Sequence, residues 1–538
     1  MRRLRIVALA SAAAFVFTSV AVTAAAPGTT STSATSKAKK VLAQKAKKAR
    51  KAKAKKATAR RTVTRAAAAL QIPFTAGQKS GSAANMELVG QHALGGRGFN
   101  ADVWVHENHA YVGRWGFTDW AQGSKERFCP EGEDGGIAVV NVTNPANPVW
   151  VSTLPKPRGT SVEDVVVFTA PYGPMAGRDI AAVGVQVCGG DRTDASFARG
   201  LKLYDVTDPA RPVEIDPGTA DVNTGCCTRG LHELEVEHND DLDRTFVFAS
   251  VPASEYPDDS SPTGRRDRQG KGDFRLIDIT DPENAVEVSN WGVLANNMPG
   301  LPEGQGCDPD PIFGHSVEPS ADGKRAFVAY WDSGFIELNV TNPSTPLFVK
   351  RAAYQPDEDG DAHSSMFDDE RNLLFTADED FCPHSGPGIE TGWGYLRIWD
   401  WGATPTQPPV QIGEYRTPNS VKATGVASGD YTIHNPMLME TDVYISWYSD
   451  GVRVVNAANP RAPEEVAHFV PPASLNPVKP PQRGVLSQTP QVWGVYVDML
   501  DPARASLGGK CVTGQTTDSC LVFASDMNSG LWILRRTD

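Results

Sequence analysis

Four histidines occupy the same place in a repeated pattern of the sequence. Each stands at the beginning of a strand-like segment, and they are His232, His315, His363 and His434. Glu163 holds the corresponding place in a neighbouring copy of the pattern. Neutral imidazole is a common ligand of transition metals, and three histidines with a carboxylate form a workable binding or catalytic site. These five side chains are therefore predicted to hold a divalent transition metal: Zn, Cu, Mn or Fe.

A structural role for these histidines is the alternative. Polar residues at strand starts can hydrogen-bond the neighbouring sheet, so that each imidazole acts as a staple. Nearby loops add further polar residues, which are Asp332, Asp378, Asp380, His384, Asp450 and Asp526. For Asp332, Asp450 and Asp526 we favour a structural role, because Asp is a common turn former and each lies beside a glycine-containing turn.

An internal repeat supplies the elements that must position these residues. In most copies glycine opens a strand-like run, a Thr-Asn-Pro or Thr-Asp-Pro turn follows, and a second short strand ends the copy, as in "GLKLYDVTDPARPVEID" from Gly200. Further copies begin at Gly135, Gly272, Gly334, Gly394, Gly451 and Gly530. Two more strand signals separate successive copies, which gives four strands per unit. Four-stranded units repeated radially are the blades of a β-propeller.

The ends of the repeat predict how the ring closes. The copy at Gly530, "GLWILRR", has no fourth strand, and "NMELVGQHAL" near Asn85 has the pattern of one. We therefore expect an all-β, seven-bladed β-propeller over residues 85–538, closed by pairing of Met86–Ala93 beside Leu531–Leu534. The starts of the innermost strands ring one mouth of the channel, so the four histidines should converge there.

The strand and turn sequences "LKLYDVTDPARPVEI", "FRLIDITDPENAVEV" and "IAVVNVTNPANPVWV" resemble the LVIVD-repeat family of secreted or surface bacterial β-propellers. The resemblance covers roughly Asn85 to Arg535 and is weak in the copy at Gly394, where "IWDWGATPTQPP" replaces the turn. It implies a propeller outside the cytoplasm. It implies no reaction, substrate or catalytic residue.

The N-terminal region predicts export. Residues 1–26 combine Arg2, Arg3 and Arg5 with an apolar stretch and a small-residue end, as in a cleaved signal peptide. No later stretch is long and apolar enough to span a bilayer, so we expect no transmembrane span in the mature chain. The predicted location is therefore secreted or extracellular, in association with the cell wall.

A basic segment follows the signal. Residues 27–80 are predicted to be a disordered Lys/Ala-rich tail, because Lys37 to Arg65 holds 14 Lys or Arg and no acid. Residues 67–538 carry 35 basic residues against 64 acidic ones, because 17 of the 52 basic residues lie in residues 1–66. An exported tail would meet anionic cell-envelope polymers before nucleic acid, so the envelope polymer is the expected partner. A flexible spacer is the alternative.

Eight cysteines in an exported chain favour disulfides over thiolate metal sites. Cys511 and Cys520 flank a short turn and could pair. The others are expected in loops on the histidine-bearing face, and their pairing stays open; they are Cys129, Cys188, Cys226, Cys227, Cys307 and Cys382.

Two function classes remain open. The first is a surface protein that binds an unidentified ligand or protein at the channel mouth. The second is a metal-dependent oxidoreductase or hydrolase at the same place. The mature chain has no G-x-S-x-G element, no phosphate-binding glycine loop and no zinc-protease motif, so nucleophilic hydrolysis has no support.

Overall fold

The computed structural model describes residues 81–118, 127–129, 135–188, 198–215, 222–223, 228–252, 254–255, 271–299, 312–355, 358, 360–381, 383, 392–422, 429–473, 489–515 and 518–538. All of them belong to the unit Ala69–Asp538. The predicted signal peptide and basic tail lie outside the described residues. Helical structure in the described part is limited to short 3-10 turns, η1 (Leu94–Gly96), η3 (Pro282–Asn284) and η4 (Ala505–Leu507).

Antiparallel four-stranded sheets are the main unit of the fold. One contains β14 (Leu234–Asn239), β15 (Arg244–Ser250), β16 (Phe274–Asp278) and β17 (Val286–Trp291). The next contains β18 (Ser316–Pro319), β19 (Arg325–Ala329), β20 (Phe335–Asn339) and β21 (Leu347–Ala352). A third contains β22 (Ala362–Asp368), β23 (Leu373–Asp378), β24 (Leu396–Asp400) and β25 (Val410–Tyr415).

A nine-stranded sheet joins two such units through a single pair of residues, Arg114 and Val162. One half contains β3 (Asn100–His106), β4 (His109–Arg114), β7 (Ile137–Asn141) and β8 (Val149–Leu154). The other contains β9 (Thr160–Thr169), β10 (Asp179–Val187), β11 (Gly200–Asp205), β12 (Val213–Glu214) and β13 (Val222–Asn223). A separate small hairpin pairs β5 (Phe117–Thr118) with β6 (Arg127–Phe128).

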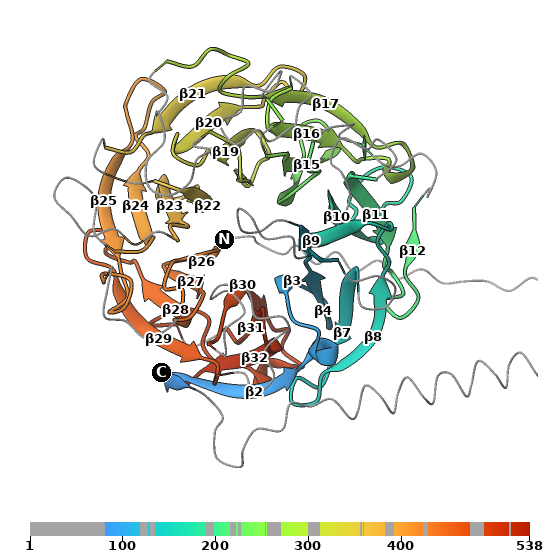
Figure 1. The fold of residues 1–538 in the computed structure, drawn as a ribbon, viewed down its shortest axis with the longest axis vertical. Coiled ribbons are helices and arrows are strands. Elements are labelled where there is room, and N and C mark those ends of the chain that lie inside the picture. The colour runs from blue at the N-terminus through green and yellow to red at the C-terminus, as the bar shows by residue number, and fades with distance from the viewer. Residues whose placement is uncertain are drawn as a thin grey trace, which may run out of the picture. The chain divides into compact units, whose positions relative to one another are not determined.

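The sheets surround a common centre within this unit. Figure 1 shows β22, β26 (Pro436–Met439) and β30 (Val492–Met499) toward the inside, and β21, β25 and β29 (Glu464–Val470) toward the outside. Apolar side chains fill the space between adjacent sheets; for example, Phe248 of β15 shares a buried cluster with Val328 of β19. The predicted all-β class and β-propeller fold are confirmed.

The predicted N-terminal closure is confirmed. β2 (Met86–His92) pairs antiparallel with β32 (Gly530–Arg536), which pairs in turn with β31 (Cys520–Asp526) and β30. Met86 lies opposite Arg536 and His92 opposite Leu531. The amide of Thr537 also donates to the carbonyl of Asn85 at 3.0 Å. The first and last described segments therefore form one sheet.

One strand at this seam was not predicted. β1 (Ser82–Ala84) pairs with the outer strand β29 of the preceding sheet, beside β28 (Gly451–Asn456), β27 (Asp442–Trp447) and β26. All three residues of β1 are exposed, so no apolar pattern marks them. Asn85, at a positive φ of 52°, turns the chain from β1 into β2. The N-terminal segment thus pairs with two neighbouring sheets.

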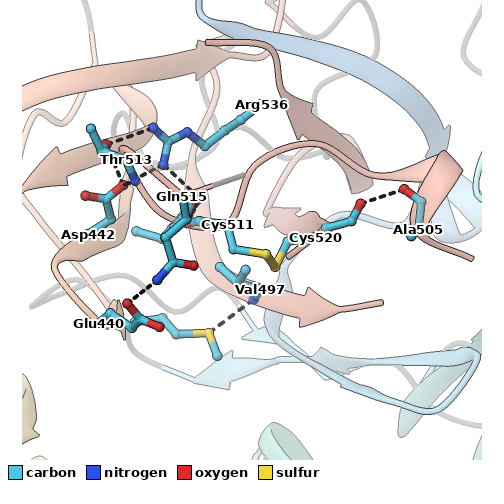
Figure 2. The surroundings of a disulfide bond; sticks show 12 residues. Glu440, Asp442, Val497, Ala505, Cys511, Thr513, Gln515, Cys520 and Arg536 are labelled. Atoms are coloured by element: carbon cyan, nitrogen blue, oxygen red, sulfur yellow. Dashed lines mark hydrogen bonds and ion pairs between the residues drawn. A yellow bond between two sulfur atoms is a disulfide. The ribbon is translucent and has the colours of Figure 1, made fainter. Parts of the chain in front are cut away.

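A disulfide holds the loop between β30 and β31 near the same seam. Figure 2 shows Cys511 joined to Cys520, the first residue of β31, as predicted. Thr513 and the buried guanidinium of Arg536 both donate to Asp442, at 2.8 Å from Thr513 Oγ1 and 2.6 Å from Arg536 Nη1. The disulfide ties the loop to β31, and the hydrogen bonds of Thr513 and Arg536 to Asp442 tie it to β27 and β32.

None of the helices in the described part of the chain is long and apolar enough to cross a membrane.

Candidate metal centre

The four predicted histidines lie at equivalent places in four sheets. His315 directly precedes the inner strand β18, His363 lies in β22, and His232 and His434 stand two residues before β14 and β26. Backbone hydrogen bonds to the adjoining strand fix three of them: the amides of His232, His315 and His434 donate to the carbonyls of Ser250, Ala329 and Ser446 at 2.8–2.9 Å. The repeat register therefore sets the height of each imidazole in the ring.

The imidazoles form a continuous arc. Ring centroids are 4.4 Å apart between His232 and His315, 4.0 Å between His315 and His363, and 4.1 Å between His363 and His434. The Nε2 atoms of His232 and His315 lie 2.9 Å apart, so these rings share a hydrogen bond. Residues more than 200 positions apart in the sequence thus belong to one cluster.

All four side chains are buried, with exposures of 6% for His232, 7% for His315, 1% for His363 and 0% for His434. They do not line an open mouth, as the register alone suggested. Their walls are aromatic: Trp331 stacks on His315, and Trp493 and Tyr448 pack on His434.

Five imidazole nitrogens in this arc have no hydrogen-bond partner among the described residues. They are Nδ1 of His315 and both ring nitrogens of His363 and His434. The staple hypothesis requires each ring nitrogen to bond the adjacent backbone. The backbone at His363 raises the pKa of His315, and the backbones at His434 and Trp493 do the same for His363 and His434. None of these contacts reaches hydrogen-bond geometry. Orphaned buried nitrogens are costly, so the arc calls for a ligand.

Three buried carboxylates flank the arc, and only one of them was predicted. Glu163 lies beside His232, with Oε2 2.8 Å from Nδ1, and also accepts from Gln186 at 3.1 Å. Glu233 Oε1 is 3.8 Å from both His315 Nδ1 and His363 Nε2. Glu379 places Oε2 3.5 Å from His363 Nε2 and Oε1 3.7 Å from His434 Nε2. Glu233 and Glu379 are therefore closer to the orphaned nitrogens than Glu163 is.

Burial keeps the four imidazoles and the three carboxyl groups neutral. It lowers the pKa of His232 to about 3, helped by the charge of Arg229, and lowers the pKa values of His315, His363 and His434 well below their usual range. Burial likewise raises the pKa of Glu163 to about 8 and those of Glu233 and Glu379 well above their usual range. Neutral imidazole is the form that binds metals, and a cation would let the carboxylates ionise.

The spacing of the donor atoms fits a metal ion. Ligand atoms about 2.0–2.2 Å from a tetrahedral metal lie roughly 3.3–3.6 Å from one another. The carboxylate-to-imidazole distances of 3.5–3.8 Å are close to this spacing. Three overlapping groups of potential ligands result: His232, Glu233 and His315; Glu233, His363 and His434; and His315, His363 and Glu379.

Most of the loop acids named from the sequence have structural roles. Asp378 accepts from Arg397 Nε at 2.5 Å and from the Tyr354 hydroxyl at 2.7 Å. Asp450 accepts from Asn419 Nδ2 at 2.8 Å and pairs with Arg453.

Asp526 accepts from the amides of Asn528 and Ser529 inside its own turn. Asp332 and Asp380 are buried outside the candidate ligand groups of the described residues. His384 lies outside the described residues.

A second disulfide joins Cys129 to Cys188, two of the loop cysteines. Cys226, Cys227, Cys307 and Cys382 lie outside the described residues.

A comparison with protein-family models supports the repeat. The LVIVD repeat model matches residues 97–118 and 314–353, and the second match begins one residue before His315. No curated protein matches the chain.

Among solved structures the chain is similar to Chaetomium thermophilum Raptor, at 10% identity and a TM-score of 0.43, over 84% of this chain and 29% of that one. It is also similar to the Cps50 (Swd1) β-propeller domain of Myceliophteria thermophila, at 11% identity and a TM-score of 0.42, over 81% of this chain and 96% of that one. Saccharomyces cerevisiae Sqt1 matches at 12% identity and a TM-score of 0.42, over 82% of this chain and 97% of that one.

These low identities and TM-scores carry no information about function. The chain thus carries LVIVD repeats at two segments of a β-propeller fold.

Proposed function

We propose that the chain is a secreted or cell-surface β-propeller that binds a ligand or protein partner, with a divalent transition metal held at the arc of His232, His315, His363 and His434. The observation that carries the proposal is the set of buried imidazole nitrogens without partners beside buried carboxylates. Glu233 and Glu379 would complete the ligand set. Glu163 would act through His232, holding its ring orientation as carboxylates do for metal-binding histidines.

We favour a binding role over the metal-dependent oxidoreductase or hydrolase. A catalytic metal keeps one coordination position open to substrate. The imidazoles here are at most 7% exposed and are walled by aromatic rings. A bound metal would cross-link four sheets and stabilise the ring.

The architecture proposed with this function has seven blades. The nine-stranded sheet counts as two blades, because its halves share a single residue pair. The sheets built on β14, β18, β22, β26 and β30 supply the other five. We further propose cleavage of a signal peptide after residue 26 and adhesion of the basic tail, residues 27–80, to an anionic envelope polymer. The two disulfides support an oxidising location.

Metal analysis of the purified, tag-free protein tests the metal centre. We expect one or more equivalents of Zn, Cu, Mn or Fe in the unmodified protein and a loss of stoichiometric metal in His315→Ala/His363→Ala. His109→Ala is the matched control, since His109 bonds Asn141 and belongs to none of the candidate groups in the described chain. Adding metal at 100 times its Kd should stabilise the unmodified protein by about 2.7 kcal/mol. Stoichiometric metal in the double variant, or none in the unmodified protein, would refute the proposal.

A further inference from the structure

A cavity of about 320 Å³ lies along the channel, beyond the imidazole arc. The inner strands β3, β9, β14, β18, β22, β26 and β30 all contribute to its wall. The lining residues come after the histidine positions in the sequence, so the cavity lies further along the inner strands than the imidazole arc does. Its volume is in the range of pockets that hold small organic ligands.

One side of the cavity is acidic. Glu233, Glu235 and Glu237 alternate along β14 and its start, and all three line the cavity. Glu318 lies on the neighbouring strand β18, and Asp164 on β9. Five acidic side chains from β9, β14 with its start, and β18 therefore line one space.

The other side of the cavity is apolar and aromatic. Met366 of β22 and Met437 of β26 line it, together with Trp104 and Tyr496, whose ring centroids are 4.9 Å apart. Each of these four residues lies three positions after the place that histidine occupies in its repeat. Glu235 and Glu318 lie three positions after His232 and His315 in the same way. Carboxylates, thioethers and aromatic rings therefore face the channel at one level.

A buried polar atom in the wall points independently to a ligand. Ser365 Oγ has no hydrogen-bond partner among the described residues, and Ser365 is 7% exposed and lines the cavity. Buried polar atoms are normally satisfied, so a molecule that can hydrogen-bond to this hydroxyl would complete the site.

We propose that this cavity binds a linear di- or polyamine. Its ammonium groups would pair with Glu235 and Glu318, and its methylene chain would lie on Met366, Met437 and Trp104. An ammonium group on an aromatic face gains further stabilisation. A calcium ion would prefer six to eight oxygen ligands around it, which a half-apolar wall does not supply. Glu233 lies between the cavity and the metal centre, but Glu235 and Glu318 belong to none of the candidate metal-ligand groups of the described residues, so the amine site does not depend on the metal.

Calorimetric titration of the full chain with spermidine tests this proposal. We expect saturable binding with one equivalent in the cavity and at least tenfold weaker binding in Glu235→Gln/Glu318→Gln, which keeps the size of both side chains. The matched control is Asp208→Asn/Glu283→Gln, which removes two acids outside the cavity lining. It should bind as the unmodified protein does. Met366→Lys, which places an ammonium group in the cavity, should also abolish binding.

Two results would overturn the polyamine site. Equal weakening in the cavity and control variants would show adsorption of spermidine to the acidic surface. Displacement of spermidine by an equal concentration of Ca²⁺ would show a site for hard metal ions. The variant His315→Ala/His363→Ala should keep its spermidine affinity even when it loses metal, which distinguishes failure of this site from failure of the metal centre.

Discussion

Met86 offers the sharpest test of how the ring closes. It lies on β2, is 5% exposed, and packs in one buried cluster with Phe469 of β29 and Trp532 of β32. Met86→Ala leaves a cavity between two sheets. Replacing a buried Met by Ala costs about 2–5 kcal/mol, against a total stability of about 5–15 kcal/mol for a typical protein. The variant should therefore lose a large part of its resistance to unfolding.

Urea unfolding followed by tryptophan fluorescence measures this loss as a lower midpoint at an unchanged slope. Glu87→Ala is the control on the adjacent residue. Glu87 is exposed and pairs with Arg535 at the surface, where an ion pair contributes about 0–1 kcal/mol. Equal midpoints for the two variants would refute the closure. As a second check, deletion of residues 1–95 should destabilise the ring sharply, and deletion of residues 1–75 should not.

Two further predictions concern stability. Cys511→Ser/Cys520→Ser should cost about 2–3 kcal/mol in the same urea assay, because the bond closes a loop of nine-residue separation beside the seam; an unchanged midpoint would contradict this. Burial raises the pKa of Glu465, but hydrogen bonds from His468 and Tyr415 and the charge of Arg453 outweigh burial and lower it to about 2. The native state then binds fewer protons than the unfolded chain between pH 4.5 and pH 2, so stability falls as the pH decreases through that window. Glu465→Gln should remove about 1–2 kcal/mol of this acid-induced loss, allowing for partial solvation. Parallel pH profiles of the variant and the unmodified protein would be the contrary result.

The repeat made most of the fold predictable. An opening glycine, a strand-like apolar run and an Asx-Pro turn recur in most copies, so local chemistry and sheet pairing agree. Equivalent positions of a closed repeat lie at one height, and for this reason His232, His315, His363 and His434 could be predicted to form one cluster. β1 could not be predicted, because its residues are exposed and only its backbone pairs with β29.

The candidate site was predicted less completely than the fold. Glu379 follows Asp378, the last residue of β23, and strand alternation no longer determines side-chain direction there. The acid chosen from the sequence, Asp378, is held by Arg397, while its neighbour Glu379 faces His363 and His434. Glu233 could not be predicted for another reason: it follows His232 directly, and strand alternation places successive side chains on opposite faces.

The hydrogen bond from the Thr537 amide to the Asn85 carbonyl holds the residues after β32 beside the start of β2. A short peptide could join Asp538 to Asn85 directly, and the chain could then be opened at another exposed turn, such as the one at Asn342 between β20 and β21. Such a circular permutant would keep the strand pairs of the ring except that of β1 with β29, and would move the seam to the sheet of β18–β21. The order of the blades in space is therefore independent of which blade is synthesised first.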